Sequence, residues 1–495
     1  MRRAALFSIA AAVGLAACNG PAQSPATPNV LPQRAAGEPR HAPNDFSVND
    51  LHAGGATSGA VAFNGGSQPV GLAVGNGGVG NPQAPPAAGT LFGTIKEPFG
   101  GTIYYCLTSS GSGRAVFEGG PGAASAPAIG PCAPLGAKAT GYGARVDPLD
   151  FAASDVALAS TDYTTYKTYR EPSTGTNWGE PVELPSFAGE IVFGYRPQDF
   201  SKTYNSRIHL STWTMCAIAN GTVSDWNDAA ITKDNGASIT HGVSQPIVFY
   251  FRSDNAATSY TLTYHLNAVC NRTWRSPYNK PPYTYPGHGA QWVYGYNSVW
   301  PGPGSAAAPN ARFVGVIGNP GIIAAIESTP FALGYAEGAW AKAANPPVAE
   351  AFVQSGYHRT TGPVWSDPLS VASTSASLGV VTNKSLTYGG GSDGLPLTTT
   401  RPECVLYVDP SKFTNPEALG APDGAYPIVQ IGYLLFYGNN NGVHTQAKRH
   451  LLYYLSTQRA HNIETQFGYT PLSPSLQGAV NAAVRGGNGH SPCVQ

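Results

Sequence analysis

Charged side chains are scarce in this sequence. Asp, Glu, Lys and Arg together make up 11% of the 495 residues, and their formal charges cancel to a net charge of 0. A protein without excess positive charge exerts no long-range attraction on nucleic acid, and the sequence contains no basic stripe. We therefore expect no nucleic-acid partner.

Metal-binding patterns and long apolar runs are also missing. No CxxC pair and no H-E-x-x-H motif occurs, and the histidines show no ligand spacing, so no zinc site is predicted. Beyond the N-terminal segment, no stretch contains the roughly 18 uninterrupted apolar residues of a spanning helix. We expect no metal, no cofactor, and a domain that is soluble or tethered to a membrane.

Glycine (60 residues), proline (43) and tyrosine (26) are abundant, which suits an exported, loop-rich protein. Two arginines precede the apolar residues 4–17, a run that is too short to span a membrane. The run ends in L-A-A-C, which resembles a bacterial lipobox whose cysteine becomes the lipidated first residue of the mature protein. We predict a lipoprotein signal peptide at residues 1–18 with lipidation at Cys18. A plain secretory signal cleaved near the same site is the alternative.

Residues 19–44 are rich in proline and alanine and predict a disordered tether. After removal of Cys18, six cysteines remain, and an even count in an oxidising compartment suggests three disulfides. The sequence does not determine how they pair. Our hypothesis, in which each bridge would staple one region, is Cys106–Cys132, Cys216–Cys270 and Cys404–Cys493.

Strand-like and helix-like segments alternate along the chain, which predicts the α/β class. Short apolar or β-branched runs favour strands, and apolar residues at helical spacing favour helices. The expected strands lie at 102–106, 149–158, 191–195, 331–337 and 426–436, and the expected helices at 210–219, 319–326, 446–458 and 472–484.

Residues 246–260 have the pattern of an anion-binding turn. An apolar strand at 247–251 ends in Arg252, and a helical pattern begins at Thr258 after small residues. The first turn of a helix has N–H groups without intrahelical partners, and its dipole favours negative charge. An arginine adds a fixed fork of donors. The alternative is an ordinary strand–helix turn in which Arg252 pairs with Asp254.

Three further segments place small or hydroxyl residues where a loop meets a helix start. They offer the hydroxyls of Thr57 and Ser109 and one carboxylate, Asp155. A site of many donors with one acceptor suits an anion that carries a proton, such as hydrogen phosphate. Asp155 capping the next helix is the alternative, and which of the serines at 109, 110 and 112 points inward stays open.

The order of these segments resembles that of the phosphate-binding proteins of bacterial phosphate ABC importers, the PstS family. Family members carry, in order, G-A-G-A-T-F, G-S-S-G, D-F-G-A-S-D, W-[ND]-D-x-x-I, R-x-D-G-S-G-T-[ST]-F, G-N-x-G-[IV], P-G-A-I-G-Y-V-E and G-Y-x-P-L. The corresponding segments here are A-G-G-A-T-S at 53–58, S-S-G at 109–111, D-F-A-A-S-D at 150–155, W-N-D-A-A-I at 226–231, R-S-D-N-A-A-T-S-Y at 252–260, G-N-P-G-I at 318–322, P-F-A-L-G-Y-A-E at 330–337 and G-Y-T-P-L at 468–472.

The resemblance implies a two-lobed periplasmic-binding-protein type II fold with a hinge and a central ligand cleft. Lobe 1 would comprise residues 45–193 plus 427–490, and lobe 2 residues 194–426. The crossing strands would lie near 191–195 and 428–436. The protein would be a monomer in the periplasm or at the cell surface, held to a bacterial membrane only by its lipid. It would bind inorganic phosphate without being an enzyme and deliver it to an ABC permease.

The resemblance also implies the phosphate-binding residues. Their backbone N–H groups and hydroxyls would donate to the anion, Asp155 would accept the phosphate proton, and Arg252 would pair with the anion while Asp254 orients it. The set is Thr57, Ser58, Ser109, Asp155, Arg252, Ala257 and Thr258, with Asp254 and Ala256 in support.

The chain departs from the family pattern at several positions. Ala256-Ala257 replaces a Ser-Gly pair, which removes a hydroxyl donor, and Ser58 replaces Phe. Insertions are expected near 114–145 and 350–405. These departures leave two alternatives open, a surface protein with a phosphatase-like or adhesive role and a binder of another oxyanion or an organic phosphate.

Two other patterns are weaker. G-G-S-D-G at 390–394 matches the G-x-S-x-G of a nucleophile elbow, but the Leu-Pro that follows does not start a helix, so we predict a surface loop. The aromatic residues between 274 and 300 could stack on sugars, but we expect packing for a proline-rich loop or a partner surface.

Overall fold

The structure is a computed structural model. It describes residues 50–66, 86–95, 101–120, 149–171, 178–201, 207–270, 291–344, 347–358, 360–414, 420–439, 444–487 and 489–495. The predicted signal peptide, the tether, Cys18 and Cys132 lie outside these residues, as does most of the first expected insertion. Of its described residues, 114–120, those from Arg114 to Glu118 are helical. Among the described residues, no helix is long and apolar enough to cross a membrane.

A ten-stranded sheet runs through the described part of the chain in the order β2-β1-β3-β14-β4-β8-β6-β7, with β15 and β9 also pairing to β4. The strands are β1 (Leu51–Gly55), β2 (Ile103–Leu107), β3 (Phe151–Ser154), β4 (Pro181–Tyr195), β6 (Val248–Arg252), β7 (Phe313–Val316), β8 (Ala332–Glu337), β9 (Ala349–Glu350), β14 (Val429–Tyr437) and β15 (Thr470–Pro471).

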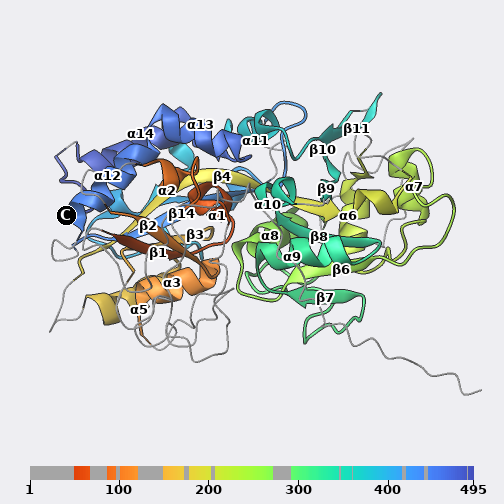
Figure 1. The fold of residues 1–495 in the computed structure, drawn as a ribbon, viewed down its shortest axis with the longest axis horizontal. Helices are drawn as coiled ribbons and strands as arrows, with labels where there is room; N and C mark the ends of the chain where they lie inside the picture. The colour runs from red at the N-terminus through yellow and green to blue at the C-terminus, as the bar shows by residue number, and fades with distance from the viewer. Residues whose placement is uncertain are drawn as a thin grey trace, which may run out of the picture.

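Strand β4 joins two halves of this sheet (Figure 1). In the first half, β1 pairs in parallel with β2 and β3, and β14 lies antiparallel between β3 and the start of β4. In the second half, β6 pairs in parallel with β7 and β8, and β8 lies antiparallel to the end of β4. The strand predicted at 191–195 is therefore the end of a strand of 15 residues.

Helices cover both faces of the first half (Figure 1). Helices α3 and α5 lie on one side of β1 to β3, and α12 to α14 lie on the other. The helices are α1 (Ala60–Asn64), α2 (Leu91–Thr94), α3 (Ser110–Glu118), α5 (Ser160–Arg170), α6 (Thr212–Ala219), α7 (Ala229–Asn235), α8 (Ala257–Cys270), α9 (Gly318–Ser328), α10 (Gly338–Ala343), α11 (Val371–Leu378), α12 (Thr445–Leu455), α13 (Gln458–Gln466) and α14 (Pro474–Arg485).

Helix α8 shows how the sequence pattern produces the packing. Leu262, Leu266 and Val269 recur at helical spacing, and all three side chains are buried in the core. Cys270, at its last position, forms a disulfide with Cys216 of α6. The apolar face and the disulfide together fix the position of the whole helix, and with it the position of its first turn.

Two of the three predicted disulfides are confirmed, Cys216–Cys270 and Cys404–Cys493. Cys106 is also disulfide-bonded, but its predicted partner lies outside the described residues. The second disulfide ties the C-terminal segment to the end of the second expected insertion.

The second expected insertion, 350–405, has secondary structure of its own. Its elements are β10 (Phe352–His358), β11 (Gly362–Ser366), α11 and β12 (Leu386–Tyr388), and β13 (Leu406–Val408) follows and pairs with β12. The prediction of a surface loop at 390–394 is only partly right. Gly390 and Gly391 are buried, because this end packs under the β12–β13 pair, whereas the tip at Asp393 and Gly394 is exposed.

The described part of the aromatic segment contributes to the core. Trp292 and Trp300 are buried, and Trp300 stacks on Phe251 of β6 with ring centroids 5.6 Å apart. This agrees with the expected packing role for residues 291–300. Tyr296 in the same segment is about half exposed.

Candidate functional site

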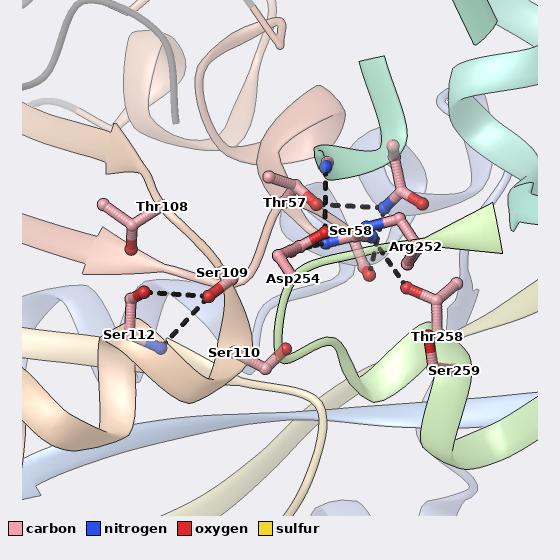
Figure 2. Close-up of polar contacts among 12 residues, drawn as sticks. Thr57, Ser58, Thr108, Ser109, Ser110, Ser112, Arg252, Asp254, Thr258 and Ser259 are labelled. Atoms are coloured by element: carbon pink, nitrogen blue, oxygen red, sulfur yellow. Dashed lines mark hydrogen bonds and ion pairs between the residues drawn. The ribbon is translucent and has the colours of Figure 1, made fainter. Parts of the chain in front are cut away.

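Four predicted segments meet where the two halves of the sheet face each other. The loop after β1, the start of α3 and the end of β3 come from the first half, and the turn from β6 into α8 comes from the second. Gly111 of α3 donates its N–H to the carbonyl oxygen of Asn255 at 3.2 Å, directly across this boundary. Figure 2 shows Thr57 and Ser58 gathered beside the Arg252–Asp254 pair.

Arg252 is almost fully buried, with 1% of its surface exposed. Its Nε donates to Asp254 Oδ1 at 2.7 Å, Nη2 donates to Asp254 Oδ2, and Nη1 donates to Thr258 Oγ1 at 2.9 Å. The backbone N–H of Gly318 donates to the same carboxylate at 3.0 Å. The Arg252–Asp254 pair expected from an ordinary strand–helix turn therefore exists, and it lies at the first turn of α8.

Asp254 is held in its ionised form by these partners. Burial acts to raise the pKa of its carboxyl, but the Arg252 charge, the Arg252 hydrogen bonds and the Gly318 N–H together hold that pKa below its ordinary value. An ionised Asp254 fixes the guanidinium plane and leaves its Nη1 edge directed at Thr258.

Asp155 is a second buried carboxyl near this pair. Its Oδ2 accepts from Ser110 Oγ at 3.1 Å, and its backbone N–H donates to the same hydroxyl at 3.3 Å. Burial raises the pKa of Asp155 to about 6, against the lowering effects of hydrogen bonds from Ser58 and Ser110 and of the Arg252 charge. The Arg252 guanidinium and the Asp155 carboxyl therefore influence each other across the two halves.

The alternative reading of Asp155 as a helix cap is wrong. Helix α5 begins only at Ser160. The N–H groups at its start are bonded by other carboxylates, Ala159 by Asp162 at 2.9 Å and Ser160 by Asp393 at 3.0 Å. Asp155 instead faces the boundary between the halves.

Among the three serines that the sequence left open, Ser110 contacts Asp155. The hydroxyl of Ser109 accepts from the backbone N–H of Ser112 at 3.1 Å and donates to its hydroxyl at 2.9 Å (Figure 2). Ser109 is thus the N-cap of α3. The side chain of Ser109 is engaged within the helix start, whereas Ser110, which the resemblance did not select, bonds to Asp155.

Thr57 and Ser58 are joined to the second half by residues that the sequence analysis did not select. Asn319 Nδ2 donates to Thr57 Oγ1 at 3.1 Å and lies 3.4 Å from Ser58 Oγ. Trp340 Nε1 donates to the carbonyl oxygen of Thr57 at 2.8 Å. Asn319 belongs to the G-N-P-G-I motif, so the motif carried a signal for it.

Ala256 and Ala257 are both 1% exposed at the start of α8. The N–H of Ala256 donates to the carbonyl oxygen of Ser298 at 2.8 Å, so this residue is held by the aromatic segment. The N–H groups that follow it belong to the first helical turn, where no intrahelical acceptor exists. Among the described residues, no group of three or more His, Cys, Asp or Glu side chains could hold a metal ion.

Comparison with known proteins places this geometry in context. A family model described as the PBP superfamily domain matches residues 104–458. The phosphate-binding protein PstS2 of Mycobacterium bovis BCG is 26% identical over 359 residues, covering 70% of this chain and 77% of the relative. A phosphate-binding protein from an unknown prokaryotic organism is 29% identical over 184 residues, covering 37% of this chain and 40% of the relative, so that match spans less than half of its length.

The solved structure of a high-affinity periplasmic phosphate-binding protein bound with phosphate has a similar fold. The TM-score is 0.55 at 19% sequence identity, and the superposition covers 88% of this chain and 93% of the other. This likeness confirms the predicted α/β fold class of periplasmic binding proteins.

The raised pKa of Asp155 makes the stability of the unliganded protein depend on pH. An Asp whose pKa is about 6 in the folded state and 3.8 in the unfolded state stabilises the fold below pH 3.8, and this contribution is lost as pH rises through 6. We expect Asp155→Asn to leave the free energy of unfolding unchanged near pH 4 and to increase it by roughly 2–3 kcal/mol at pH 8. Urea unfolding at both pH values measures this. An equal effect at the two pH values would contradict it.

Proposed function

The chain belongs to the PBP superfamily, and on this premise we propose that it binds inorganic phosphate between its two halves and delivers it to an ABC importer. The relatives found by comparison are named as phosphate-binding proteins and not as enzymes. The observation that carries the proposal is that the carboxyl of Asp155 and the guanidinium of Arg252 are both buried and that the Arg252 charge lowers the pKa of Asp155.

One acceptor among many donors matches the chemistry of hydrogen phosphate. Above pH 6, Asp155 is ionised for most of the population, so it accepts a hydrogen bond from an anion that still carries a proton. A fully ionised anion such as sulfate would place an oxygen lone pair against the carboxylate and be repelled. Arg252 would offset the remaining negative charge.

We propose the following roles for the surrounding groups. The backbone N–H groups of Thr57 and Ser58, of Ser109 at the start of α3, and of Ala257 and Thr258 at the start of α8 would point at the anion. Helix starts favour negative charge through their unpaired N–H groups and their dipole. Asp254 would hold the Arg252 guanidinium in place, and N–H groups of this guanidinium would donate to the anion.

Residues 45–193 plus 427–490 and residues 194–426 would form the two lobes. Strand β4 passes from one half of the sheet to the other, which makes it the natural place for a hinge. The bonds from Asn319 and Trp340 to Thr57 cross between the halves and would hold a closed state. Opening for ligand entry would break them.

Titration calorimetry on the chain without residues 1–18 tests the phosphate proposal. We expect one-to-one binding of phosphate at neutral pH, no heat with sulfate, and at least tenfold weaker phosphate binding in Arg252→Lys, which keeps the charge but loses the fork of donors. Thermal unfolding checks that the variant is folded. Absence of phosphate binding by the wild type would refute the proposal, and hydrolysis of a phosphomonoester would favour a phosphatase-like protein.

The missing hydroxyl at Ala256 gives a second, independent prediction. A hydrogen bond to a charged group contributes roughly 1.5–3 kcal/mol, and about 1.4 kcal/mol corresponds to a tenfold change in affinity. We expect Ala256→Ser to tighten phosphate binding by about tenfold or more, measured by calorimetry. Ala256→Val, which adds volume without a hydroxyl, is the control and should weaken binding. Equal affinities for Ala256→Ser and wild type would show that this position does not face the anion.

We also propose that the protein is a monomer outside the cytoplasm, anchored through a lipid on Cys18 and partnered with an ABC permease. The disulfides Cys216–Cys270 and Cys404–Cys493 suit an oxidising compartment. In a bacterial host, we expect Cys18→Ser to abolish incorporation of labelled fatty acid and to move the protein from the membrane fraction to the soluble fraction. Unchanged labelling of the variant would refute lipidation at this residue.

A further inference from the structure

A pocket borders Asp155. Its walls come from the end of β3, from α8, from β14 and from the segment around β13. The lining includes Asp155, Tyr260, Tyr407, Gln430 and Tyr433. Its volume of about 20 Å³ is that of one or two water-sized groups.

Asp155 belongs both to the predicted anion site and to the pocket. Its Oδ2 accepts from Ser110 at the predicted anion site, and the same residue lines the pocket. A Cβ atom at Gly432 of β14 would lie 3.2 Å from Asp155 Oδ1, so the glycine leaves room beside this carboxyl.

Gln430 gives the pocket a polar end. The residue is 3% exposed and lies on β14. Its Oε1 atom is buried and has no hydrogen-bond partner among the described residues. A buried acceptor without a hydrogen-bond donor is destabilising. We therefore expect the pocket to hold a group that carries an O–H or N–H.

The outer wall of the pocket is formed by the segment around β13, which follows the second insertion. Val408 donates its N–H to Tyr433 Oη of β14 at 3.2 Å, and His265 Nδ1 of α8 donates to the carbonyl oxygen of Thr414 at 2.8 Å. Ser392, within the insertion, donates its N–H to the carbonyl oxygen of Leu158 at 2.9 Å. These bonds fix the wall to both halves of the sheet, so the pocket has a defined shape.

We propose that this pocket is a subsite for the fourth substituent of the bound anion. The chain would then accept small phosphonates or phosphate monoesters whose substituent has about two non-hydrogen atoms and ends in a hydrogen-bond donor. Three oxygens of the ligand would face Arg252 and the helix starts, and the substituent would pass Asp155 to donate to Gln430 Oε1. The inference rests on the proposed phosphate site and names a wider ligand class for it.

Two ligands of equal size separate the donor requirement from the volume. We expect hydroxymethylphosphonate to bind the wild type within tenfold of phosphate in titration calorimetry, and ethylphosphonate, which lacks the hydroxyl, to bind at least tenfold more weakly. Gln430→Met removes the acceptor at similar volume. It should abolish the preference between the two phosphonates and change the phosphate Kd by less than twofold, whereas Gln430→Glu should retain the preference.

The outcomes distinguish this inference from the proposed function. Binding of phosphate without binding of hydroxymethylphosphonate would overturn the subsite, assign the pocket to water, and leave the proposed function standing. Binding of hydroxymethylphosphonate without phosphate would support the subsite and overturn phosphate as the ligand. No heat with either ligand would overturn both. A preference that survives in Gln430→Met would also refute the assigned role of Gln430.

Discussion

The buried pair of Arg252 and Asp254 is the interaction on which the site depends. A guanidinium that is 1% exposed is tolerated only because a carboxylate binds two of its nitrogens and Thr258 accepts from the third. The pair sits where β6 ends and α8 begins, and the disulfide at the end of α8 fixes that helix to α6. One positive charge is thereby placed at the boundary of the two halves, where it lowers the pKa of Asp155 against the opposite effect of burial.

Several polar contacts cross this boundary. Asn319 and Trp340 donate to Thr57, and Gly111 donates to Asn255. Polar groups of this kind can bond to water instead, as the proposed opening for ligand entry would require. The segment around β13 adds contacts on the side of Asp155 and narrows the space next to the carboxyl. This space would therefore select which substituent the ligand can carry, in addition to the selection of the anion by Arg252 and Asp155.

The sequence predicted the class of the fold and the strand–helix turn at Arg252, because both depend on local patterns. The even number of cysteines predicted disulfides but not their pairing, and two pairs of the pairing hypothesis are confirmed. It did not select Asn319 or Trp340, whose partner Thr57 lies 262 and 283 residues away. It could not choose between Ser109 and Ser110, because that choice depends on where α3 begins. It marked residues 350–405 only as an insertion. In the structure Asp393 of this segment accepts from Ser160 at the start of α5, and the chain then continues into β13, where Val408 donates to Tyr433 of β14. No local pattern encodes these contacts.

We propose that one anion lies between Asp155 and Arg252, and a crystal structure of the protein grown with phosphate would show whether it does. We expect a single phosphate with one oxygen within hydrogen-bond distance of the Asp155 carboxylate and another within hydrogen-bond distance of the Arg252 guanidinium. A phosphate bound elsewhere, with the Arg252–Asp254–Thr258 arrangement left intact and no ion beside it, would refute this binding site.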